Sequence, residues 1–167
     1  MGCGTGANLA FYPNTVKHIV LTEPSIHMRK ILQAKLADNP QDNIELFNDK
    51  AESLSLADAS VDAVVCTLVL CSVKHLEKTL SEIYRVLRPQ GKLIFIEHVA
   101  ATNNVERYKW QCRLEFLWKC IAAGCHVTRR TEEAMTQAGF KIVEIERQSM
   151  RGVPKIVRPS IRGIAVK

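Results

Sequence analysis

Short apolar runs alternate along the chain with longer segments in which apolar residues recur at helical spacing. The runs are rich in Ile, Val and Leu, which predicts buried strands. The predicted strands span residues 17–23, 44–47, 62–67 and 92–97. Residues 25–37 and 75–87 carry apolar side chains three and four positions apart, which predicts amphipathic helices, and Ser25 is placed to cap the first of them.

This alternation of strand and helix over residues 17–97 indicates parallel strands joined by right-handed crossover helices. We therefore expect a doubly wound α/β fold. Pro89 and Gly91 are expected to close the helix over residues 75–87 before the next strand begins.

The last part of the chain has a different composition. Residues 105–123 form an aromatic-rich helical stretch that includes Trp110, Phe116 and Trp118. Two interpretations are open: a helix that covers an edge of the sheet, or a lid whose aromatic side chains wall a substrate site. Beyond this stretch, the pattern predicts a helix over residues 131–138 and strands over residues 140–147 and 161–166.

A glycine-rich turn opens the chain. Gly2, Gly4 and Gly6 alternate before residues 7–12, which can begin a short helix. Glycines let the backbone approach a ligand closely, and the N-terminus of a helix favours a negatively charged group. Glu23, at the end of the next apolar run, can accept hydrogen bonds from both ribose hydroxyls of an adenosine ligand. The sequence therefore predicts a nucleotide-binding turn.

Two other interpretations of this turn stay open. Ala7 also completes the pattern G-x-G-x-x-A, which is typical of dinucleotide-binding dehydrogenases. Alternatively, the glycines only allow a helix to pack closely on a strand.

Composition narrows the choice of function. A chain of 167 residues suits one domain, residues 1–167, and contains no apolar run long enough to span a membrane and no signal peptide. The net charge of +6 comes from dispersed Lys and Arg, so we expect a solvated basic face and no nucleic-acid partner. The six cysteines have no paired C-x-x-C spacing, so we expect reduced thiols and no metal.

Several later stretches, taken together, resemble class I S-adenosylmethionine-dependent methyltransferases. The most specific is the Arg-Val-Leu-Arg-Pro-x-Gly turn at residues 85–91, within the longer match over residues 82–97, and a second match covers residues 62–68. Further segments resemble the methyltransferase-like thiol S-methyltransferase branch, whose members are membrane-associated and alkylate small thiols. These segments are residues 66–73, 97–99, 124–129 and 157–167.

The resemblance implies a three-layer, doubly wound α/β fold of Rossmann-like methyltransferase type, with a mostly parallel sheet and an antiparallel final strand. The chain begins inside the glycine motif, so we expect the first strand to be missing and the domain to be incomplete at its N-terminus. The resemblance also implies S-adenosylmethionine as the cofactor. Its implied contacts are Gly2, Gly4, Gly6, Glu23, Ala51, Glu52, Cys66, Thr67 and Leu68.

Two positions depart from the family pattern. Lys50 stands where many relatives in the wider superfamily carry an Asp that faces the adenine. Gln90 stands where glycine is commoner in the turn at residues 85–91.

The function implied by the resemblance is methyl transfer from S-adenosylmethionine to a small molecule, with an alkyl thiol as the expected acceptor. His98, just beyond the carboxyl end of a predicted strand, is the candidate general base. The alternative is an inactive or cofactor-binding-only fragment that lacks the first strand. We expect a monomer in the cytoplasm, and an endoplasmic reticulum or lipid-droplet location for a longer, membrane-anchored form.

Overall fold

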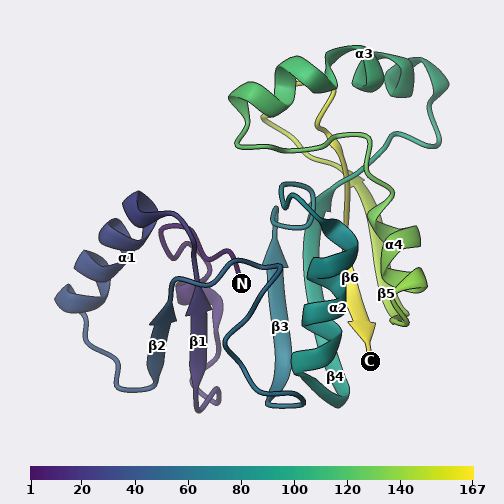
Figure 1. Ribbon diagram of the computed structural model, residues 1–167. Helices are drawn as coiled ribbons and strands as arrows, with labels where there is room; N and C mark the ends of the chain where they lie inside the picture. Colours follow the sequence, from purple (N-terminus) through teal and green to yellow (C-terminus); the bar gives the residue numbers. More distant parts are fainter. The chain divides into compact units, whose positions relative to one another are not determined.

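The computed structural model describes residues 1–167 and divides into two compact units, Met1–Ser55 and Leu56–Lys167 (Figure 1). Each unit is an α/β arrangement with its own hydrogen-bonded sheet, of two strands in the first unit and four in the second. The prediction of a single domain stays a prediction. None of the helices combines the length and hydrophobicity needed to cross a bilayer.

The first unit is a parallel strand–helix–strand crossover. Its elements in chain order are a short 3₁₀ helix η1 (Leu9–Phe11), strand β1 (Ile19–Thr22), helix α1 (Ile26–Asp38) and strand β2 (Ile44–Phe47). Strands β1 and β2 pair in parallel, with Ile19 opposite Ile44. The Ser25 hydroxyl accepts a hydrogen bond from the Met28 N–H, so the predicted cap of α1 is confirmed.

Helix α1 is less amphipathic than its spacing predicts. Leu32 is its one fully buried side chain, whereas Ile26, Met28 and Ile31 are 43–55% exposed. The prediction of an amphipathic helix is therefore wrong for most of α1, because these apolar positions are exposed.

The second unit contains a mixed four-stranded sheet in the order β3-β4-β6-β5. Strands β3 and β4 are parallel, and β6 is antiparallel to both of its neighbours, β4 and β5. This arrangement confirms the expected antiparallel final strand. The elements are β3 (Val61–Thr67), α2 (Leu76–Val86), β4 (Leu87–His98), α3 (Val105–Ile121), α4 (Thr131–Gln137), β5 (Lys141–Ser149) and β6 (Pro159–Val166).

The strand predicted over residues 92–97 is buried at alternate positions only. Leu93 and Phe95 are buried, whereas Ile94 and Ile96 are 37% and 38% exposed. Helix α2 packs against one face of β4, and successive side chains of a strand point to opposite faces. The expectation of burial on both faces is therefore wrong for this strand.

The turn predicted after α2 lies inside β4. The pairing of β3 with β4 advances from Val61 opposite Leu87 directly to Ala63 opposite Lys92, so the residues between are looped out of the register. Gln90, in this bulge, has a φ of 66°. This left-handed conformation favours glycine over residues with a side chain.

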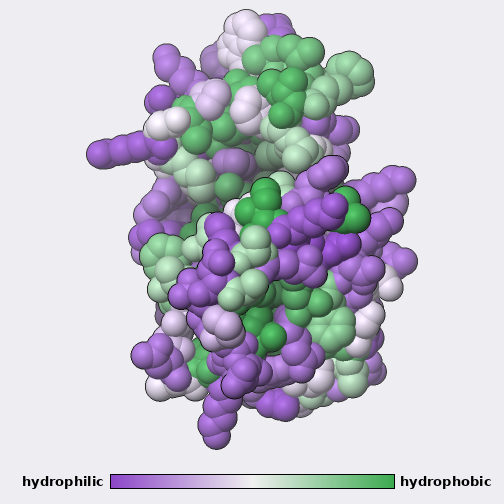
Figure 2. All heavy atoms as spheres, turned by 90° about the vertical axis from the view of Figure 1, so that its left-hand side faces the viewer, coloured by the Kyte–Doolittle hydropathy of each residue, from purple (hydrophilic) through white to green (hydrophobic).

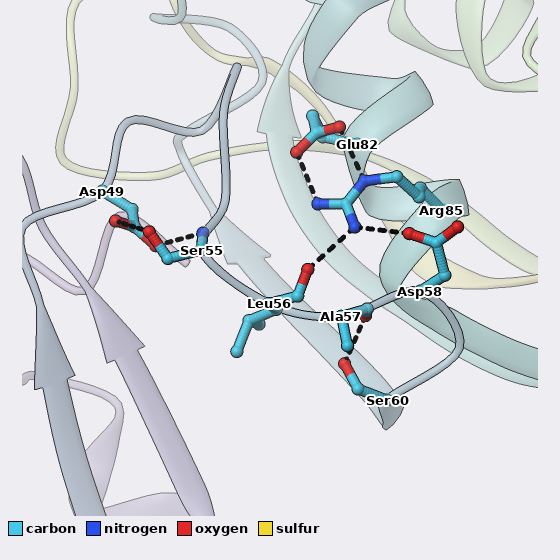
Figure 3. Close-up of polar contacts among 8 residues, drawn as sticks. All are labelled: Asp49, Ser55, Leu56, Ala57, Asp58, Ser60, Glu82 and Arg85. Atoms are coloured by element: carbon cyan, nitrogen blue, oxygen red, sulfur yellow. Dashed lines mark hydrogen bonds and ion pairs between the residues drawn. The ribbon is translucent and has the colours of Figure 1, made fainter.

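Arg85, on α2, anchors the segment that leads into β3 (Figure 3). Its guanidinium donates to the Leu56 carbonyl at 2.8 Å, to Asp58 at 2.7 Å and to both carboxylate oxygens of Glu82. The hydrogen bonds to these carboxylates raise the pKa of Arg85, so it stays charged. One side chain thus connects α2 to the segment at the beginning of β3.

Helix α3 leaves most of its apolar surface exposed. Figure 2 shows hydrophobic side chains among hydrophilic ones in the upper part of the view, where α3 lies. Gln111 is the only side chain of α3 that is buried. Both interpretations of this segment, as a cover for a sheet edge and as a lid, stay predictions. The most exposed apolar side chains of α3 are Val105, Trp110, Phe116, Leu117 and Ile121, at 51–78%.

We predict that Gln90→Gly stabilises the chain, because glycine adopts the observed φ without steric conflict. The expected gain in the free energy of unfolding is about 1 kcal/mol, after allowance for the greater freedom of glycine in the unfolded state. Urea denaturation measures it. Gln90→Ala is the matched control: it keeps a Cβ, so its stability should stay near that of the parent. Equal stability of all three proteins would contradict the assignment of strain to Gln90.

Candidate active site

The glycine turn has a backbone conformation that favours glycine. Gly2, Gly4 and Gly6 have φ values of 59°, 54° and 79°. A Cβ at Gly6 would lie 2.7 Å from Leu32 Cδ1, whose side chain is fully buried in α1. The alternation of glycines is therefore dictated by left-handed backbone at all three positions and by close packing at the third.

Glu23 holds this turn in place. Its carboxylate accepts hydrogen bonds from the Gly4 N–H at 2.8 Å and from the Ser25 N–H at 2.9 Å. The side chain is buried, at 6% exposure, directly after β1. A carboxylate offers about four lone-pair sites, so these two bonds leave acceptor capacity for a ligand.

The other predicted contacts of the first unit lie in a small turn after β2. Lys50 and Ser53 form an isolated bridge that encloses Ala51, which is buried, and Glu52, which is half-buried. Asp49 accepts hydrogen bonds from both the backbone and the hydroxyl of Ser55, as drawn in Figure 3.

The remaining predicted contacts lie in the second unit, at the carboxyl end of β3. Cys66 is fully buried, and burial raises the pKa of its thiol to about 12, so it is an inert thiol. Thr67 ends the strand. Leu68 has a φ of 58° and is 39% exposed, while its N–H donates to the Ile96 carbonyl at 2.8 Å. A left-handed non-glycine residue at the end of a parallel strand is a feature of functional loops.

A buried carboxylate organises the loop that follows. Glu97, near the end of β4 and fully buried, accepts hydrogen bonds of 2.9 Å from the backbone N–H groups of Val69, Leu70 and Cys71. Burial raises the pKa of Glu97 to about 8, and the three N–H donors act in the opposite direction.

Arg129 captures the carbonyls of the same loop. Its guanidinium donates to the carbonyl oxygens of Leu70 and Val73. The backbone of Arg129 is itself fixed, because its carbonyl accepts from the Ala100 N–H at 3.0 Å. Glu97 thus holds residues 69–73 through their N–H groups, and Arg129 holds them through their carbonyl groups.

His98 follows Glu97 and faces two cysteines. Its Nδ1 lies 3.5 Å from Cys125 Sγ and 4.0 Å from Cys71 Sγ, and its buried Nε2 has no hydrogen-bond partner. One ligand atom from each side chain lies within 4.8 Å of the others, which is close enough to share a metal ion. The expectation that no metal is present stays a prediction.

The two thiols of this cluster differ in acidity. The hydrogen bond between them lowers the pKa of Cys125 to about 7 and raises that of Cys71 to about 12. Cys125 is therefore the more acidic thiol of the pair, and it lies next to the imidazole.

Three polar residues had no assigned role from sequence: the buried Glu97 and Gln111, and the half-buried Arg129. Gln111 ties α3 to the loop after β4, accepting from the Ala101 N–H at 2.7 Å and donating to the carbonyls of Val99 and Ile156. Of the three, only Glu97 could have been singled out from the sequence. It ends a continuous apolar run, and an acid at such a buried position is expected to have hydrogen-bond partners.

A cavity of about 980 Å³ in the second unit is lined in part by Arg129. Its lining includes Arg107, Arg130, Glu133 and Arg147, and none of the residues predicted to contact the cofactor. We therefore base the site on the loops described above and not on this cavity.

Residues 1–95 match the model of a methyltransferase domain family. The chain belongs to this methyltransferase family. Human thiol S-methyltransferase TMT1A is 41% identical over 169 residues, which cover all of this chain and 69% of that protein. Human thiol S-methyltransferase TMT1B is 42% identical, with the same coverage.

The fold is shared with solved methyltransferases. A SAM-dependent methyltransferase from Methanosarcina mazei has a TM-score of 0.74 at 21% identity, covering 99% of this chain and 89% of that one. The fold is thus the Rossmann-like S-adenosylmethionine-dependent methyltransferase fold, and the strand order agrees with it.

The methyltransferase uses S-adenosylmethionine as its cofactor. The chemistry of the first unit fits this molecule. Three left-handed glycines leave backbone accessible to a ligand, and the buried Glu23 carboxylate has lone pairs to spare for ribose hydroxyls.

We predict that Glu23→Ala and Gly4→Val each weaken S-adenosylmethionine binding. Removing the carboxylate deletes charge-assisted hydrogen bonds, so Kd should rise about 10- to 100-fold by isothermal titration calorimetry. Val at a φ of 54° should displace the turn and have a similar effect.

Glu45→Ala is the matched control for this measurement. Glu45 is an exposed carboxylate on β2 that pairs with His18 at 3.0 Å, so its removal should leave Kd unchanged. A melting curve of each variant confirms that the protein is folded. Unchanged affinity in both site variants would refute the placement of the cofactor.

Proposed function

We propose that this methyltransferase transfers the methyl group of S-adenosylmethionine to the sulfur of a small-molecule thiol. The observation that carries the proposal is the similarity to two human thiol S-methyltransferases over the whole length of this chain. The general fold alone would leave the acceptor open, because one fold serves many chemistries.

In this proposal, Gly2, Gly4 and Gly6 lie along the methionine part of the cofactor, and Glu23 holds the ribose. Ala51 and Glu52 lie along the adenine. At the end of β3, Cys66, Thr67 and Leu68 border the methyl group. These roles are supported by the left-handed backbone of the glycines, the burial of Glu23 and the left-handed Leu68.

When bound, S-adenosylmethionine supplies an electrophilic methyl group on a sulfonium. The protein then has to align the acceptor sulfur with that carbon and exclude water. Glu97 and Arg129 serve alignment, because they fix residues 69–73 directly after Leu68.

His98 is the proposed general base. With its Nδ1–H donating to the Cys125 thiolate, Nε2 carries the free lone pair, and this buried atom has no partner in the protein. The thiol proton moves to Nε2 as the acceptor sulfur attacks. Cys125 then has an orienting role, since it fixes the tautomer of the imidazole.

The proposal predicts methylated product from S-adenosylmethionine and simple alkyl thiols. The test is a thiol panel with labelled cofactor, which also includes an aromatic thiol that is ionised at neutral pH. His98→Asn should lower kcat for alkyl thiols about 10²- to 10⁴-fold, the usual range for loss of a general base. It should lower kcat much less for the aromatic thiol, because that acceptor needs no base.

His18→Asn is the control, because His18 is exposed and pairs only with Glu45. An equal loss for both classes of thiol would assign His98 a structural role and remove it from the proton transfer. Cofactor bound without any methylated thiol would overturn the proposed function and favour a chain that only binds its cofactor.

A further inference from the structure

We propose that Cys71 and Cys125 form a reversible intramolecular disulfide when a hydroperoxide oxidises them. The pair is then a modification site in the second unit, and its formation can be measured without any assumption about the methyl acceptor. The argument depends on where the two sulfurs lie, how their backbones are held, and how the six thiols of the chain differ.

The two sulfurs already share one small site. Both lie within 4.8 Å of each other and of a nitrogen of His98. They belong to a buried cluster with Val127 and Val157, and Trp118 packs against it. At this separation the sulfurs have to approach each other by less than about 3 Å to reach the S–S bond length.

The backbones on both sides of the pair are in direct contact. The His126 N–H donates to the Cys71 carbonyl at 2.7 Å. A Cβ at Gly124 would lie 3.3 Å from the Ser72 carbonyl oxygen. A disulfide needs Cα atoms within about 7 Å, and the contacts between the two segments at residues 71–72 and 124–126 favour such a short separation.

The chemistry balances in two steps. The Cys125 thiolate attacks the hydroperoxide, the O–O bond breaks, and Cys125 becomes a sulfenic acid. The alkoxide that leaves, or the hydroxide in the case of hydrogen peroxide, takes a proton from solvent and becomes an alcohol or water. The Cys71 sulfur then attacks the Cys125 sulfur. The S–S bond forms, the S–O bond breaks, and the hydroxyl leaves as water with the Cys71 proton.

The remaining thiols lack this combination. Cys66 is fully buried, and burial raises its pKa to about 12. Cys112 and Cys120 are exposed on α3 and lie two turns apart, beyond disulfide distance in one helix. Cys3 is in the first unit, and burial raises its pKa. Cys125 is the one thiol whose pKa is lowered, to about 7, which agrees with its assignment as the reacting thiolate.

Oxidation would also affect the proposed base, and this consequence rests on the proposed function. A disulfide removes the thiolate that faces His98 Nδ1, so the imidazole loses the partner that fixes its tautomer. Methyl transfer should fall on oxidation and return after reduction with dithiothreitol.

The experiment uses the reduced full chain, treated with hydrogen peroxide and then alkylated. Before alkylation, we expect the intact mass to fall by two hydrogens and dithiothreitol to restore it. After alkylation, a nonreducing digest should contain one peptide pair that links Cys71 to Cys125. Cys71→Ser and Cys125→Ser should each abolish the linked peptide, and Cys120→Ser, an exposed control, should keep it.

Three results would overturn the proposal. One is oxidation of Cys125 only to the sulfenic or sulfinic acid, with Cys71 still alkylated. Another is a disulfide that maps to different cysteines. The third is stoichiometric zinc in the reduced protein that is lost in the Cys71→Ser variant, since the thiols would then be metal ligands. The linked peptide is detected in the parent chain, so a variant that misfolds cannot produce a false positive result. The test also does not depend on methyl transfer, so it stays valid if the proposed function is wrong.

Discussion

The second unit depends on one interaction: the buried Glu97 carboxylate accepts hydrogen bonds from three successive N–H groups of the loop after β3. A buried carboxyl group without partners would be unfavourable, and so would the buried N–H groups of Leu70 and Cys71 without an acceptor. Each therefore requires the other. Arg129 completes the arrangement from the opposite side by binding the carbonyls of Leu70 and Val73.

The first unit contains a similar interaction between a buried acid and backbone N–H groups. Glu23 follows β1 as Glu97 closes β4, and its carboxylate also binds backbone N–H groups of neighbouring loops, at Gly4 and Ser25. In each unit an acid at the carboxyl end of a parallel strand fixes the neighbouring loops of that unit. Methyl transfer benefits from such rigid loops, because the main contribution of the protein is to align the reacting groups.

Most elements of the fold were predictable from sequence, because strands and helices have distinct apolar periods. The strand at Ile44–Phe47 and the helix capped by Ser25 agree with their patterns almost residue by residue. The exposure of side chains was less predictable. The sequence pattern predicts that Ile94 and Ile96 are buried, but their exposure depends on which face of β4 a helix covers. Likewise, the sequence of α3 does not indicate that Gln111 is its one buried side chain.

The parts of the candidate site that belong to one short sequence motif were predictable. The parts that join residues far apart in the sequence were not. The glycines and Glu23 lie close together in the chain and have a recognisable spacing. The cluster of Cys71, His98 and Cys125 joins three separate segments, and a single sequence contains no signal for that meeting. Arg129 is another such case, since it binds carbonyls more than fifty positions away.

The central claim, that Glu97 holds the loop after β3, is tested most directly by amide hydrogen exchange in Glu97→Ala. The account predicts that the amides of Val69, Leu70 and Cys71 exchange at least about tenfold faster than in the parent chain, the effect of losing one hydrogen bond of typical strength. Amides in the β5–β6 pairing serve as the internal reference and should keep their rates. Unchanged exchange at the three loop amides would contradict the account.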